Sequence, residues 1–160
     1  MKKSGGIDAS MLHAAMGPYD PNQPSLEARA QVYRDLLGFL PPRVEARLHV
    51  TGALDPAIVE LQEQLRSHAM DTDCFEPKIV QLMLFGMLMV ELSDAATMHG
   101  IAARRAGASW KELQAVISLA YVFRGVSAAN RGADILAEIA RREEISSGPG
   151  DVPGAAGNAA

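Results

Sequence analysis

Two dipeptides in this chain, Asp55-Pro56 and Glu76-Pro77, each precede a segment in which apolar residues recur every three or four positions. Proline suits the first turn of a helix because its missing N–H has no helical acceptor there, and an acidic residue before it can cap the exposed N–H groups. Apolar residues at this spacing are typical of an amphipathic helix. The sequence therefore predicts that a helix begins at each dipeptide and that the second helix runs through Val90.

Further signals of helix starts and stops occupy most of the remaining chain. Ser109-x-x-Glu112 has the capping-box pattern, in which each of the two side chains bonds a backbone N–H group of the other residue. Other helices are expected over residues 25–37, 43–50, 93–106 and from 126 onward. The sequence leaves open whether 76–90 and 93–106 are separate, so about six helices are expected. No segment alternates apolar and polar residues as strands do, and the predicted fold class is a compact all-α domain.

The two ends of the chain differ in composition from its middle. Residues 1–24 contain three X-Pro pairs, which disfavour regular helix. Residues 146–160 consist largely of Gly, Ala, Ser and Pro. We expect the first segment to be an N-terminal arm that is partly disordered or docks on a neighbouring subunit, and the second to be a disordered tail. Residues 25–145 are expected to form one helical domain.

Composition excludes several classes of partner. The formal net charge of -4 and the pI of 5.5 argue against nucleic-acid binding, which depends on clustered Lys and Arg. The longest apolar run, residues 79–92, is shorter than the roughly 20 residues of a membrane helix, and the N-terminus lacks the apolar core of a secretion signal. The single cysteine, Cys74, cannot form an intrachain disulfide. We expect a cytoplasmic protein that binds neither nucleic acid nor membranes.

Three polar side chains in the middle of the chain are the candidate catalytic residues. If residues 91–103 form a helix, Glu91 and Asp94 share one stripe of its surface and His99 lies at the edge of that stripe. A histidine can take and give a proton near pH 7, and a nearby carboxylate can orient its ring. The alternative interpretation is a core histidine bonded to a backbone carbonyl, beside a charge pair at a helix end.

Five motifs around this histidine follow one another in a set order: Pro77-Lys78, His99, Gly107, the helix start from Ser109 to Glu112, and the segment from Phe123 to Asn130. This order resembles the carboxymuconolactone decarboxylase family, in the branch of the alkylhydroperoxidase D-like superfamily that lacks a CxxC pair. The likeness covers roughly residues 36–140. It implies a multi-helix fold of the alkylhydroperoxidase D-like type and a homo-oligomeric ring of three or six subunits.

The resemblance also implies an activity. A lyase of this family in aromatic compound catabolism would remove carbon dioxide from a small carboxylated lactone or unsaturated cyclic acid without a cofactor, with His99 as the proton donor. Arginine suits the substrate carboxylate because its planar fork can bond a carboxylate through two donors. Arg124 is the first candidate, ahead of Arg104. Phe123, which stands where tyrosine is common in the family, is expected to contact the substrate.

Several residues depart from the family pattern, and these departures bear on the expected activity. Leu92 and Ala95 stand where the redox branch has its two cysteines, so thiol peroxidase activity is excluded, because that reaction needs a thiolate. Ser127 stands where the decarboxylase branch commonly has proline. These departures keep open an alternative, a non-catalytic oligomeric helical scaffold or small-molecule-binding protein. The four histidines are scattered without the i, i+4 spacing of metal ligands on a helix, and no metal site is expected.

Overall fold

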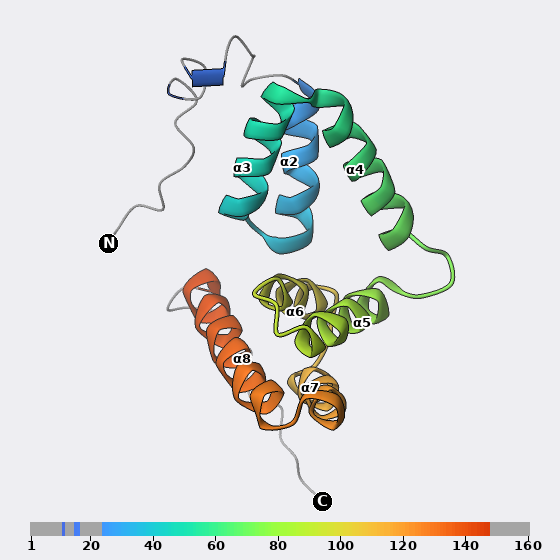
Figure 1. The fold of residues 1–160 in the computed structure, drawn as a ribbon. Helices are drawn as coiled ribbons and strands as arrows, with labels where there is room; N and C mark the ends of the chain where they lie inside the picture. Colours follow the sequence, from blue (N-terminus) through green and yellow to red (C-terminus); the bar gives the residue numbers. More distant parts are fainter. Residues whose placement is uncertain (1–10, 12–14, 17–23, 148–160) are drawn as a thin grey trace, which may run out of the picture. The chain divides into compact units, whose positions relative to one another are not determined.

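The computed structural model describes residues 11, 15–16 and 24–147. Across residues 24–147 the structure contains seven helices and no strand (Figure 1), and the prediction of an all-α fold is confirmed. The helices are α2 (Pro24–Leu37), α3 (Pro42–Leu54), α4 (Pro56–Met70), α5 (Pro77–Val90), α6 (Ala96–Arg105), α7 (Trp110–Arg124) and α8 (Val126–Ser147). The predicted arm over 1–24 and tail over 146–160 lie largely outside the described residues, and Ser146 and Ser147 belong to α8.

The helices belong to two compact units, divided in the sequence after Pro77, where the sequence predicted one helical domain over 25–145. None of the described helices combines the length and the apolar character that a membrane span requires. Each unit has its own buried residues, described in turn below.

The first unit contains α2, α3 and α4, and its apolar core consists of Leu26, Ala30, Leu48 and Val59. Between α3 and α4, the carboxylate of Asp55 accepts a hydrogen bond from the backbone N–H of Ile58 at 3.1 Å, with Pro56 in the first turn of α4. This cap is the one that the Asp-Pro dipeptide predicted, and it satisfies a backbone donor that the helix leaves without a partner.

The second unit is built around α8, which packs against both α6 and α7. Its largest fully buried side chains come from three helices, and they are Phe85 and Met89 of α5, Leu113 and Ile117 of α7, and Ile139 of α8. Gly132 allows a close approach between α7 and α8, because a Cβ atom at this position would lie 2.6 Å from Cγ2 of Ile117.

A tight turn separates α5 from α6. Leu92 adopts a positive φ of 54°, and the backbone N–H of Ser93 donates to the carbonyl of Leu88 at 2.9 Å. A residue in the left-handed region with such a bond back into the helix is a common way to end a helix. Leucine is unusual at this position because its Cβ is strained there. The turn makes α5 and α6 two helices.

The start and end of α7 follow the sequence signals. Oγ of Ser109 accepts from the backbone N–H of Glu112 at 3.2 Å, and Oε2 of Glu112 accepts from the backbone N–H of Ser109 at 2.6 Å. The predicted capping box is therefore confirmed. At the other end, Gly125 has a φ of 61°, a conformation that glycine adopts without steric cost.

Candidate functional site

His99 lies in the middle of α6, and its ring contacts a buried amide of α5. Nδ1 of the imidazole is 2.9 Å from Oε1 of Gln81. The imidazole is half-buried, whereas only 4% of Gln81 is exposed. Because the amide oxygen can only accept, Nδ1 must carry the proton in this bond. The contact therefore fixes the tautomer of a neutral ring, with the proton on Nδ1 and the lone pair on Nε2.

Gln81 was not among the candidate residues, although the sequence does contain a signal for it. It is the one polar residue in the apolar run from Ile79 to Val90 that forms most of α5. Burying an amide without a hydrogen-bond partner costs about 1–3 kcal/mol. A glutamine in a buried apolar helix therefore indicates a polar partner nearby, but the sequence alone does not say which one.

The two carboxylates predicted to share a helical face with His99 lie elsewhere. Glu91 and Asp94 occupy the turn after α5, since that helix ends at Val90 and α6 begins only at Ala96. The predicted helical stripe is therefore wrong. Both residues are exposed, and Asp94 accepts a hydrogen bond from the guanidinium of Arg131 in α8.

Arg104, one of the two predicted substrate-binding arginines, has several partners within the second unit. Its guanidinium donates to both carboxylate oxygens of Glu143, at 2.8 and 3.0 Å, and to the carbonyl of Ala108 at 2.5 Å. The same group lies over the ring of Trp110, 4.2 Å from its centroid. A guanidinium with a bidentate carboxylate and an aromatic partner is well placed to hold α6, α7 and α8 together.

The other predicted substrate-binding residues, Phe123 and Arg124, end α7. Both are exposed. Within the described residues, Arg124 forms no salt bridge. Phe123 leaves 77% of its surface exposed and lines a groove between α5 and α7.

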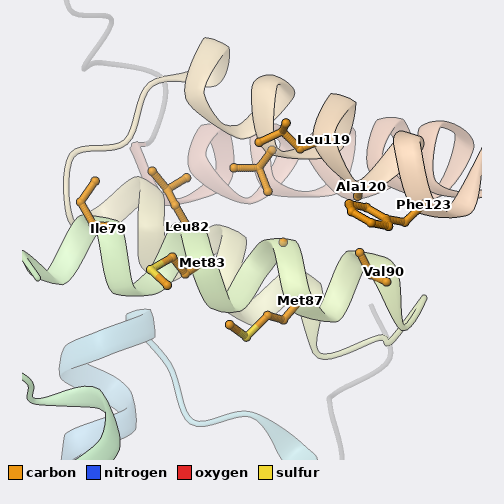
Figure 2. Close-up of a pocket in the computed structure, with 10 residues that line it drawn as sticks. Ile79, Leu82, Met83, Met87, Val90, Leu119, Ala120 and Phe123 are labelled. Atoms are coloured by element: carbon orange, nitrogen blue, oxygen red, sulfur yellow. The ribbon is translucent and has the colours of Figure 1, made fainter.

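This groove, shown in Figure 2, has a volume of about 350 Å³. All ten residues that line it are apolar or glycine. The most exposed of them form two rows, Ile79, Met83 and Met87 on α5 and Leu119 and Phe123 on α7. Ligand pockets usually add a few convergent polar groups to an apolar lining, and this groove has none in its lining.

An ion pair joins the N-terminal ends of α5 and α7. Nζ of Lys78 lies 2.9 Å from Oε1 of Glu112. The backbone hydrogen bond from Ser109 and the bond from Lys78 together lower the pKa of Glu112 from 4.5 to about 2. The lysine that the family resemblance singled out therefore has a partner in the capping box.

A buried charged cluster joins the helices of the first unit. The carboxylate of Glu63, only 8% exposed, accepts from the hydroxyl of Tyr33 at 2.9 Å, from Nε of Arg66 at 3.0 Å and from Arg47. Burial alone would raise the pKa of Glu63, but these three donors outweigh it and hold the pKa below 4.5. Burial is also the main reason that the pKa of Tyr33 is raised above 10.0. The sequence analysis missed this cluster, because nothing in the pattern of α4 marks Glu63 as buried.

Within the described part of the chain, no group of three or more His, Cys, Asp or Glu side chains could hold a metal ion. Cys74 is exposed and reduced. Comparisons with family models, with characterised proteins and with solved structures find no match to this chain.

Proposed function

We propose that this protein is a cofactor-independent lyase that removes carbon dioxide from a small carboxylated lactone or unsaturated cyclic acid, with His99 as the proton donor. The observation that supports this function is the bond between Nδ1 of His99 and the buried amide of Gln81. A ring fixed in one tautomer, with Nε2 directed away from that bond, meets a basic requirement of a general acid or base.

The chemistry needs few groups from the protein. When the C–C bond to the carboxylate breaks, its electron pair enters the conjugated carbonyl system of the substrate and carbon dioxide leaves. His99 enters this step as an imidazolium, which carries a proton on each ring nitrogen. Nε2 gives its proton to the carbon that lost the carboxylate, and the ring returns to the neutral form with its remaining proton on Nδ1. The substrate itself holds the electron pair, so the reaction requires no metal or organic cofactor. Gln81 orients the ring without adding a charge beside it.

An anionic substrate also needs a cationic partner. Arg124 is the better candidate for binding the substrate carboxylate, because Arg104 already binds Glu143, the Ala108 carbonyl and Trp110. Phe123 next to it offers an exposed ring for an apolar part of the substrate. Glu91 and Asp94 remain proposed catalytic partners through their position in the turn just before the helix of His99.

Replacing His99 tests the proposal. His99→Gln keeps a polar side chain of similar length but cannot donate a proton as an acid, so turnover of a carboxylated lactone should fall by about 10²–10⁴-fold. His68→Gln is the matched control, since His68 is exposed on α4, and its turnover should equal that of the wild type. Circular dichroism verifies that both variants remain helical. Unchanged turnover in His99→Gln would exclude this histidine as the proton donor.

We also propose that the chain works as a cytoplasmic homo-oligomer, a trimer or hexamer, in aromatic compound catabolism. The family resemblance is the source of this proposal, and the exposed apolar rows of the α5–α7 groove support it. Contiguous apolar surface of this kind often marks an interface.

A second candidate function, a non-catalytic scaffold or small-molecule-binding protein, is favoured by the purely apolar lining of the groove. Such a protein would convert none of the carboxylated lactones tested, while an apolar fluorescent dye would bind in the groove with a defined stoichiometry. Turnover by the wild type that is lost in His99→Gln would exclude this candidate.

A further inference from the structure

We propose that the α5–α7 groove is a two-fold interface that binds the same groove of a second copy of this chain. The inference rests on the assembly part of the proposed function and deepens it, since it names the surface and the geometry of the contact. The argument uses the apolar area of the groove, the direction of its two helices and the charges at its ends.

The apolar area is the first step. The lining residues Met87, Leu119 and Phe123 leave 58%, 67% and 77% of their surfaces exposed. With Ile79 and Met83 they present about 500 Å² of apolar surface, if a large apolar side chain offers roughly 150–250 Å². This lies within the roughly 300–600 Å² of the largest apolar patch on a typical monomer, a patch that is often functional. Two such faces would together bury about 1,000 Å², the lower bound for a specific interface.

The direction of the two helices is the second step. The bond between Lys78 and Glu112 joins the N-terminal ends of α5 and α7. At the other end of the groove, Val90 and Phe123 lie close together (Figure 2). The two helices therefore run in the same direction beneath the groove. A two-fold axis in the plane of the groove and perpendicular to these helices would place the helix pair of the second copy antiparallel to them, as in a four-helix bundle.

Charge complementarity favours this antiparallel arrangement. The apolar row on α5 extends from Ile79 to Val90, so full antiparallel overlap places Ile79 against Val90 of the second copy. Lys78 then lies beside Glu91 of the second copy, and the same contact recurs at the other end of the interface. The Glu91 carboxylate is exposed and forms no ion pair within the described residues, so it is available for this contact.

The charges at the two ends of the groove also favour a second copy as the occupant. An acidic or basic protein of another kind would match only one of the two signs, that of Lys78 at one end or that of Glu91 at the other. A small apolar ligand would leave both ends unused. A two-fold contact also occurs in a hexamer with dihedral symmetry, but not in a simple ring of three.

Sedimentation of the full chain is the first test of the interface. The wild type should have a mass that is an even multiple of 17.1 kDa. Phe123→Glu places a charge in the apolar contact and should raise the dissociation constant by at least about tenfold. Val122→Glu is the matched control, because Val122 is 74% exposed on the same helix but does not line the groove. Its mass should equal that of the wild type.

A charge exchange tests the antiparallel arrangement. Lys78→Glu and Glu91→Lys should each dissociate, because each homodimer would bring like charges together at both ends. An equal mixture of the two variants should recover the dimer, because every contact then joins a lysine to a glutamate. Circular dichroism verifies helicity throughout.

Three results would overturn the proposal: a monomeric wild type, equal masses for Phe123→Glu and Val122→Glu, or a mixture that stays dissociated while its two members are folded. The measured quantity is mass rather than turnover. The interface can therefore be disproved while His99 is confirmed as the proton donor. The interface can also be confirmed while His99 is excluded as the proton donor.

Discussion

The hydrogen bond between His99 and Gln81 makes a prediction that does not depend on any substrate. Because the amide oxygen accepts from Nδ1, the neutral ring should carry its proton on Nδ1 and leave Nε2 unprotonated. ¹⁵N NMR of the imidazole at a pH above 8 distinguishes the two nitrogens. In Gln81→Met, which keeps the length of the side chain but removes the acceptor, the ring should populate the other tautomer as well. An identical spectrum in the variant would show that Gln81 does not orient the ring.

The hydrogen bonds of Glu112 should make the free energy of unfolding depend on pH. The capping bonds and Lys78 lower its pKa in the folded protein from 4.5 to about 2. A lowered pKa means that the folded state holds the carboxylate more strongly than the unfolded state, so its contribution is fully present above pH 4.5 and is lost as the pH falls toward 2. The carboxylate is exposed, and solvent screening keeps this contribution small.

Urea unfolding measures this effect. The difference in free energy of unfolding between the wild type and Glu112→Gln should be constant between pH 5 and 7 and should shrink between pH 4.5 and pH 2. A difference that grows as the pH falls would contradict the assignment.

Single residues also show where the sequence was informative. Asp55, Ser109 and Gly125 each occupy the helix boundary that their types predicted, because caps and positive φ angles depend on local chemistry. Gln81 and Glu63 could not be identified in this way. Their burial depends on side chains 18 and 30 positions away, His99 and Tyr33, and no local pattern encodes such contacts.

At the scale of elements, the crossing of α7 and α8 depends on a small residue. A Cβ at Gly132 would lie 2.6–2.7 Å from three side-chain atoms of Ile117. Alanine favours a helix by about 1 kcal/mol over glycine, but this overlap should outweigh the gain. We therefore expect Gly132→Ala to lower the free energy of unfolding by about 1–2 kcal/mol. Ile117→Val alone should also lower the free energy of unfolding, but combined with Gly132→Ala it should restore part of the loss. Chemical denaturation of the wild type, the two single variants and the double variant measures this coupling.

The three helices of the first unit are tied by Glu63. Glu63→Gln removes the charge that Arg47, Arg66 and Tyr33 share in a buried position, and should cost about 1–3 kcal/mol in the free energy of unfolding. The matched control is Glu60→Gln on the same helix. Glu60 pairs with Arg29 but is half exposed, so its loss should cost less than about 1 kcal/mol. Equal costs, compared by thermal and urea unfolding, would show that the burial of Glu63 has no energetic consequence.

The break between α5 and α6 shows the limit of periodicity. Ser93 and Asp94 signalled a helix start, but the apolar spacing on either side also fitted one bent helix. The deciding feature is the left-handed conformation of Leu92, a residue type that gives no hint of such a turn. The predicted catalytic stripe depended on a continuous helix and was wrong for that reason, while His99 itself kept its place within α6.

At the scale of the whole molecule, the sequence predicted helices and the absence of a membrane span, and both agree with the described residues. It predicted one domain, whereas the chain divides after Pro77 into two compact units, each with its own buried residues. Composition could not reveal this division, because a chain with 48% hydrophobic residues can form one core, two cores, or cores completed by another subunit.

The proposed two-fold interface leads to a prediction about stability. When only the folded dimer exists in quantity, raising the protein concentration favours it by mass action. For a chain of this size, each tenfold increase should raise the Tm by about 1–3 °C. Phe123→Glu should have a Tm that is independent of concentration, and Val122→Glu should retain the dependence of the wild type. Calorimetry at three concentrations measures all three proteins, and a wild-type Tm that does not move would mean that association contributes nothing to the stability of the fold.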